Sequence, residues 1–98
     1  MRVIYHPHAE AELIEAAQYY DSRVPALGAQ FLDETNRAVA RIRETPEGWK
    51  VVEGNVRRYL MSRFPFEVYY RQYSDHIHIL AFKHHSRHPD YWRSRVSE

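Results

Sequence analysis

Two helical segments that lie only a few residues apart constrain the fold of this chain most. The first carries an apolar stripe at helical spacing, formed by Ala9, Leu13, Ala16, Ala17 and Tyr20, with Glu10, Glu12 and Glu15 expected to face outward. The second has a clearer stripe, formed by Leu27, Phe31, Leu32, Thr35, Ala38, Val39 and Ile42, and is expected to end before Pro46 and Gly48. Because the connection around Pro25 is so short, the segments are predicted to form an antiparallel helical hairpin that packs both stripes on a sheet.

The remaining segments read as strands. Residues 2–6 form a short strand stopped by Pro7, residues 56–61 form another, and Phe66, Val68 and Tyr70 alternate with polar residues in a third. In the last strand Ile77, Ile79 and Ala81 are expected on one face, and His78, Leu80, Phe82 and His84 on the other. Its apolar middle predicts a central position in the sheet. The order is β-α-α-β-β-β, and residues 89–96 are expected to form a final helical turn.

Length and composition indicate a single domain without disulfides or a membrane-spanning segment. Its 98 residues make a single domain, and a hydrophobic fraction of 44% is enough for a small core. The absence of cysteine excludes disulfides and thiolate metal sites. Nothing at the N-terminus resembles a signal peptide, and no apolar run approaches the roughly 20 residues that span a membrane. We therefore expect a cytoplasmic protein.

The charge distribution is uneven although the formal net charge is only +1. Residues 1–49 carry five Arg and eight Asp or Glu, whereas residues 50–98 carry seven Arg, two Lys and five Asp or Glu. The excess of arginine over lysine favours planar, bidentate recognition of anions. The basic half ends in a tail, residues 84–95, that is rich in His, Arg and aromatic residues. Such a tail predicts contact with a polyanion or an acidic partner.

Several motifs in this order resemble the RelE/ParE superfamily of toxins from bacterial type II toxin–antitoxin modules. The matching pieces span nearly the whole chain: residues 11–20, Leu27-Gly28 with Phe31, residues 38–46, Arg57-Arg58, residues 64–71, residues 79–82, and the phrase His84-x-x-Arg87-x-Pro89-x-Tyr91-Trp92 after a strand. The last phrase is the strongest part of the resemblance. The resemblance implies an α+β fold in which the helical hairpin packs on one face of a small twisted antiparallel sheet. It also implies a cognate antitoxin that covers the toxin with an acidic segment.

The resemblance leaves the cellular target open. RelE-like members cut mRNA on the ribosome, whereas ParE-like members poison DNA gyrase and need no nuclease chemistry. Cleavage of RNA by its own 2′-hydroxyl needs a base, an acid and cations around one phosphate. If the chain is a nuclease, the candidate catalytic residues are His84, His85, Arg87 and Tyr91, where Tyr91 matches a functional tyrosine of RelE-like toxins. The candidate residues for binding nucleic acid or another target are Arg57, Arg58, Arg71, Arg87, Trp92 and Arg93.

One residue departs from the nuclease pattern. Glu67 stands where ribonucleolytic relatives carry an arginine, and a carboxylate repels phosphate. Arg71 lies four residues further on, about 13 Å away in an extended strand, so it does not replace that cation. ParE-like inhibition of gyrase is therefore slightly favoured over mRNA cleavage, and a degenerate, non-toxic member that still binds antitoxin remains a third hypothesis.

Structural roles compete with these functional ones. Tyr91 and Trp92 are expected to pack the terminal segment onto the sheet in preference to stacking on a base, and Arg87 has Asp90 or Glu67 as possible partners. The sets His76-x-His78 and His84-His85-x-x-His88 are accompanied by no Cys and no matching carboxylate cluster, so we expect no metal and no cofactor.

Overall fold

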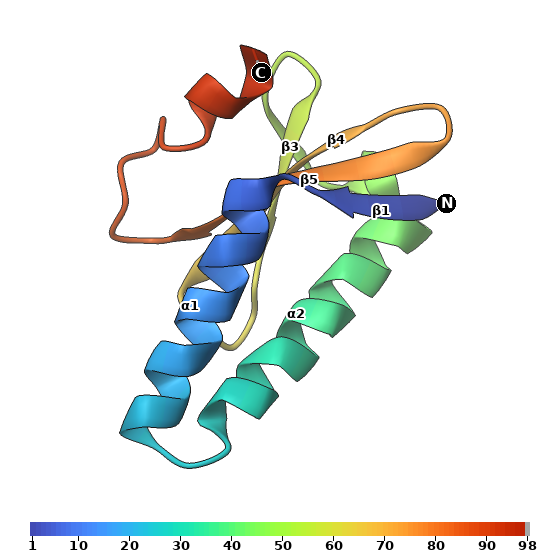
Figure 1. Ribbon diagram of the computed structural model, residues 1–98. Coiled ribbons are helices and arrows are strands. Elements are labelled where there is room, and N and C mark those ends of the chain that lie inside the picture. Colours follow the sequence, from blue (N-terminus) through green and yellow to red (C-terminus); the bar gives the residue numbers. More distant parts are fainter. Residues whose placement is uncertain (98) are drawn as a thin grey trace.

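The computed structural model describes residues 1–97 and has the predicted fold, two helices on one sheet (Figure 1). Its elements, in chain order, are β1 (Arg2–Tyr5), α1 (Pro7–Arg23), α2 (Leu27–Glu44), the 3-10 turn η1 (Pro46–Gly48), β2 (Lys50–Glu53), β3 (Val56–Leu60), β4 (Phe66–Gln72), β5 (His76–His84) and the 3-10 turn η2 (Arg93–Ser97). The α+β class and the helical hairpin are confirmed. The final helical turn begins later than expected.

The five-stranded sheet has the order β1-β5-β4-β3-β2. The predicted central position of β5 is confirmed, because it pairs with β1 on one side and with β4 on the other. Two details differ from the sequence-based prediction. The edge strand β1 runs parallel to β5, so the sheet is mixed. The strand β2, absent from the prediction, pairs antiparallel with β3 through a turn in which Gly54 adopts a φ of 53°.

The hairpin is fixed by local signals at both ends of its connection. Pro7 opens α1, and the His6 side chain accepts a hydrogen bond from the His8 amide. At the other end, Gly28 lets α2 approach α1 closely. Its amide donates to Asp21 Oδ1 at 2.7 Å, and a Cβ at this position would lie 2.4 Å from the carbonyl oxygen of Ala17. A side chain here would push the two helices apart.

The helices cover one face of the sheet, which we call the helix face. Its core includes Phe31 and Ile42 from α2, Phe66, Val68 and Tyr70 from β4, and Ile77 and Ile79 from β5. Leu13 and Tyr20 of α1 pack against this core as expected. Leu32 was expected in the buried stripe of α2, but it is 39% exposed because its position faces away from the sheet.

The C-terminal segment covers the opposite face, which we call the tail face. Trp92 is buried and stacks on Tyr69 with a ring separation of 5.6 Å, next to Val56, Leu80 and Ala81. A β-bulge makes this packing possible. Tyr69 pairs with Ala81 but Tyr70 pairs with Ile79, so Leu80 is an extra residue in β5. The strict alternation predicted for β5 is therefore wrong beyond Ile79: Leu80 and Ala81 pack on the tail face, and Phe82 packs on the helix face.

A buried ion pair ties the tail to α1. The two terminal guanidinium nitrogens of Arg95 donate to the Glu12 carboxylate at 2.9 and 2.7 Å, and Arg95 also donates to the carbonyl oxygen of Leu80. Glu12 in turn accepts the amide of Phe82 at 3.1 Å. The expectation that Glu12 faces outward was wrong, because α1 lies across β5 and the tail returns to meet it.

No helix within residues 1–97 is long and apolar enough to cross a membrane.

Candidate functional site

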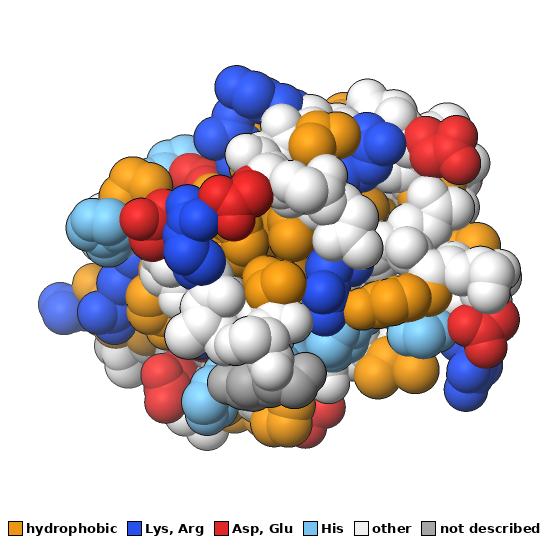
Figure 2. Space-filling view, turned by 90° about the horizontal axis from the view of Figure 1, so that it is seen from above, with side chains coloured by type: hydrophobic (Ala, Val, Ile, Leu, Met, Phe, Trp, Pro, Cys, Tyr) orange, Lys and Arg blue, Asp and Glu red, His pale blue; other side chains and the backbone are white. Residues whose placement is uncertain are grey.

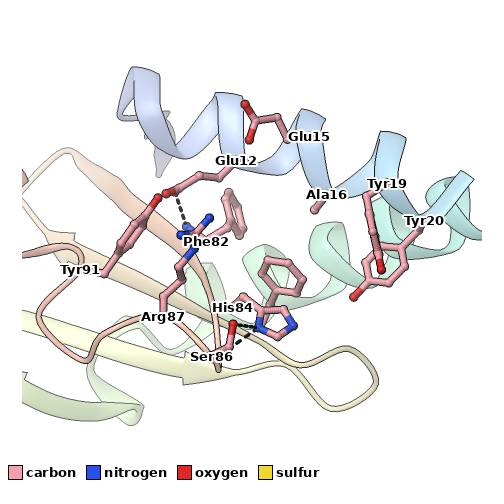
Figure 3. Close-up of a pocket in the computed structure, with 11 residues that line it drawn as sticks. Glu12, Glu15, Ala16, Tyr19, Tyr20, Phe82, His84, Ser86, Arg87 and Tyr91 are labelled. Atoms are coloured by element: carbon pink, nitrogen blue, oxygen red, sulfur yellow. Dashed lines mark hydrogen bonds between the residues drawn. The ribbon is translucent and has the colours of Figure 1, made fainter. Parts of the chain in front are cut away.

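A cavity of about 430 Å³ lies between α1 and the segment that follows β5. Figure 3 shows Glu12 of α1 extending towards Tyr91, with Arg87 and His84 on the other side of the cavity, and Glu15 of α1 also lines it. Its apolar lining comes from Ala16, Tyr19, Tyr20, Phe66 and Phe82. The cavity therefore combines an aromatic interior with a few charged groups, which is the usual character of a binding site.

Three of the four candidate catalytic residues line this cavity, namely His84, Arg87 and Tyr91. The ring of His84 is fixed in place. Its Nδ1 accepts the amide of Ser86 at 3.0 Å and lies 2.8 Å from the Ser86 hydroxyl, and its ring packs edge-on against Phe66. In the neutral ring the proton is then on Nε2, so His84 is held as a donor more than as a base.

Arg87 and Tyr91 are neighbours at the mouth of the cavity. The Arg87 guanidinium lies 5.7 Å from the centre of the Tyr91 ring, and Arg87 makes no ion pair within residues 1–97. Burial and contact with the Glu12 carboxylate raise the pKa of Tyr91, although Arg95 opposes this. A tyrosine with a raised pKa gives up its proton less readily, which suits a binding role better than proton transfer.

His85 lies on the tail face, away from the other three. Its Nε2 is 3.6 Å from a carboxylate oxygen of Glu67. The same carboxylate lies 3.7 Å from Lys83 Nζ and accepts the Tyr69 hydroxyl at 2.5 Å. Burial and the hydrogen bond to Glu67 raise the pKa of Tyr69 to about 12, while Arg58 lowers it.

The candidate binding residues are dispersed over the sheet. Arg57 donates to the carbonyl oxygens of Glu47 and Trp49 at 3.1 and 2.8 Å, which is a structural role. Arg58 and Arg71 are half-buried on the tail face, paired across the ladder with Tyr69 and Val56 respectively.

Two tail residues chosen from the sequence are already engaged inside the fold. Trp92 is 3% exposed, so its ring does not offer the free stacking surface that its place in the sequence indicated. Arg93 bonds to Glu53 and, at 2.9 Å, to Asp90. Asp90, a possible partner of Arg87 in the sequence analysis, therefore pairs with Arg93.

The surface on the side of the tail is mixed in charge. Figure 2 shows Lys and Arg side chains scattered among acidic and hydrophobic ones in this view, without one continuous basic patch. Among the described residues no group of three or more His, Asp or Glu is arranged to hold a metal ion.

Sequence reasoning missed the residues that form the α1 side of the cavity: Glu12, Glu15, Tyr19 and Tyr20. A signal for two of them was present, because adjacent tyrosines on an amphipathic helix place at least one ring at the edge of the buried stripe. The role of Glu12 had no local signal, because its partner Arg95 lies 83 residues away in sequence.

Comparison with known proteins agrees with the fold. A family model described as the ParE toxin of the type II toxin–antitoxin system parDE matches residues 3–89. Among solved structures, the chain is similar to a chain described as the chromosomal ParDE TA system from P. aeruginosa, with a TM-score of 0.64 and 19% identity over 86% of this chain and 95% of that one. At this identity the likeness concerns the fold alone. No curated protein matches the sequence.

Proposed function

This chain belongs to the ParE toxin family of type II toxin–antitoxin systems, and we propose that it arrests growth by binding DNA gyrase rather than by cutting RNA. The observation that carries the proposal is the division of the candidate catalytic groups by the sheet. His84, Arg87 and Tyr91 line the cavity beside α1, whereas His85 contacts Glu67 on the tail face.

This division matters because RNA cleavage needs its groups around a single phosphate. A base and an acid must reach opposite sides of the phosphorus centre, and cations must contact its oxygens. In the cavity, Arg87 is accompanied by two carboxylates, Glu12 and Glu15. Glu12 is already paired with Arg95, so Glu15 remains as a further carboxylate in the cavity with the guanidinium of Arg87, and this balance disfavours a phosphodiester. A binding mechanism makes no such demand on the arrangement.

The target is tested by comparing two reactions directly. Purified chain is added to gyrase with relaxed plasmid, and separately to ribosomes that translate a defined mRNA. Inhibited supercoiling with intact mRNA supports the proposal. Cleaved mRNA at equal concentrations, with normal supercoiling, contradicts it and favours the RelE-like alternative.

A pair of variants separates contact from chemistry within the cavity. Tyr91→Phe removes one hydroxyl and little contact area, whereas Arg87→Ala removes the exposed cation at the mouth. If the chain acts by binding, Tyr91→Phe retains growth arrest at equal expression and Arg87→Ala weakens it. Loss of growth arrest in both variants, with normal folding, would favour nuclease chemistry.

We further propose that a cognate antitoxin covers the cavity with a segment that carries an acidic residue beside a bulky apolar one. Arg87 offers the acidic residue a partner, and the rings of Phe66 and Phe82 offer the apolar side chain a floor. Charge attraction of this kind speeds association at low salt. The rate at which wild type associates with the antitoxin should fall between low and moderate ionic strength. The association rate of Arg87→Ala should fall less over the same interval. Equal salt dependence in both proteins would remove Arg87 from the interface.

A further inference from the structure

The carboxylate of Glu67 has an unusual set of neighbours on the tail face. The Tyr69 hydroxyl donates to it at 2.5 Å, Lys83 Nζ lies 3.7 Å away, and His85 Nε2 lies 3.6 Å away. Arg58 adds a positive charge close enough to lower the pKa of Tyr69. The carboxylate thus has two basic side chains and a hydroxyl donor beside it, and a third basic side chain lies near that hydroxyl.

These neighbours form a built site. The Lys83 and Glu67 side chains are only 4% and 12% exposed, so solvent screens their charges weakly. Arg58 Nε is buried and has no hydrogen-bond partner within residues 1–97. The His85 side chain is 48% exposed and forms the side of the cluster open to solvent.

The positive charge of the groups around Glu67 exceeds the negative charge of its carboxylate. Lys83 and Arg58 together carry two positive charges, against the single negative charge of Glu67. A buried lysine is tolerated when an anion stays beside it. Glu67 supplies that anion from within the chain, directly opposite Lys83 in the β4–β5 ladder.

We propose that Lys83, Arg58, His85 and the Tyr69 hydroxyl form an oxyanion site whose occupant is the chain's own Glu67. The ligand class is a small oxyanion such as phosphate or acetate, or one phosphate group of a larger molecule. While Glu67 fills the site, external phosphates are excluded from it. This inference deepens the proposed function, because an occupied site keeps external phosphates away from the tail face, and its test does not depend on gyrase.

The test replaces the occupant and offers a substitute. Glu67→Gln keeps the shape of the side chain and removes its charge. The uncharged Gln amide is held only weakly by the cations, so an oxyanion should displace it towards solvent and bind them in the folded state alone. Phosphate should therefore raise the melting temperature of this variant by about 5 °C more than that of wild type. Acetate, which mimics the lost carboxylate, should act in the same direction.

The matched control is Glu53→Gln, which makes the same change in net charge at a carboxylate that is half exposed beside Arg93. Phosphate stabilises many folded proteins weakly by exclusion from their surfaces, and this control measures that effect. A second variant, Glu67→Gln with Lys83→Met, removes the central cation and should lose the additional response.

The outcomes divide clearly. A phosphate shift in Glu67→Gln that exceeds the shifts in wild type, Glu53→Gln and the double variant supports the site. Equal shifts in all four proteins overturn it. If Glu67→Gln is unfolded in dilute buffer, circular dichroism should show folding when phosphate is added, and failure of both phosphate and acetate to restore the fold also overturns the proposal. Because wild type retains Glu67 throughout, its effect on supercoiling is judged separately.

Discussion

The two faces of the sheet are closed by different kinds of interaction. On the helix face, Tyr20, Phe31, Phe64 and Phe66 form a continuous aromatic cluster with ring separations between 4.9 and 6.4 Å. On the tail face, a smaller apolar cluster around Trp92 and Tyr69 is accompanied by the Arg95–Glu12 ion pair and by the polar neighbours of Glu67.

This difference teaches where stability and specificity come from in a small domain. Apolar burial on the helix face is non-directional and supplies most of the driving force. The tail face instead uses charged groups whose geometry must be correct, so that each removal leaves a partner unsatisfied. The tail is therefore expected to detach before the helix-face core unfolds.

The largest effect is expected from Phe31→Ala. Phe31 is fully buried and packs against three aromatic rings, so truncation leaves a cavity and should destabilise the fold by about 4 kcal/mol. Thermal and denaturant unfolding measure the loss. Leu32→Ala, one residue along α2 and partly exposed, is the control and should change stability little. Unchanged unfolding in Phe31→Ala would mean that the core lies elsewhere.

A somewhat smaller effect is expected from Arg95→Ala, about 3 kcal/mol, because Glu12 loses its charged partner but keeps the amide of Phe82. Hydrogen exchange should rise first at residues 89–97, while α2 stays protected. Arg93→Ala, which breaks exposed ion pairs in the same segment, should barely change the melting temperature. Equal destabilisation by both variants would contradict the distinction between buried and exposed pairs.

The smallest effect concerns two adjacent tyrosines on opposite faces. Burial raises the pKa of Tyr70 to about 12, and burial with the Glu67 hydrogen bond raises that of Tyr69 to about 12. The folded state therefore holds both phenolic protons more tightly than the unfolded chain, whose tyrosines titrate near about 10. Their contribution to stability is complete below about pH 10 and is lost as the pH rises towards 12. Melting temperatures measured across this interval should fall.

The variants Tyr70→Phe and Tyr69→Phe measure how much each tyrosine contributes to this fall in melting temperature. Tyr70→Phe gives up a hydrogen bond to the carbonyl oxygen of Pro46, and Tyr69→Phe gives up the one to Glu67, but each removes one titrating group. The pH dependence should flatten in each variant. A wild-type slope retained in full by both variants would show that another group titrates in this interval.

The sequence predicted the helix face better than the tail face, and the reason is physical. Periodicity reports which residues of one element share a face, so the stripes of α1 and α2, apart from Leu32, and the alternation of β4 were read correctly. It does not report a bulge, a short edge strand such as β2, or a parallel pairing such as that between β1 and β5. These depend on contacts between segments distant in the chain.

The same limit applies to the candidate site. Residue type identified His84, Arg87 and Tyr91, which do line one cavity. It also grouped His85 with them, although neighbours in a strand point to opposite faces. Glu12 was misread as a surface residue because its partner is near the other end of the chain.

Leu80, the extra residue in β5, changes which residues of the strand face the helices. Before Leu80, odd-numbered residues such as Ile77 and Ile79 face the helices; after it, even-numbered residues such as Phe82 do. This single count decides that His84 lines the cavity while His85 faces Glu67. If all residues of β5 paired in regular alternation without the bulge, the two histidines would exchange faces, whereas deletion of Leu80 alone would leave each on its present face. The side chains available for chemistry on each face of the sheet therefore depend on the length of β5 as well as on the identity of its residues.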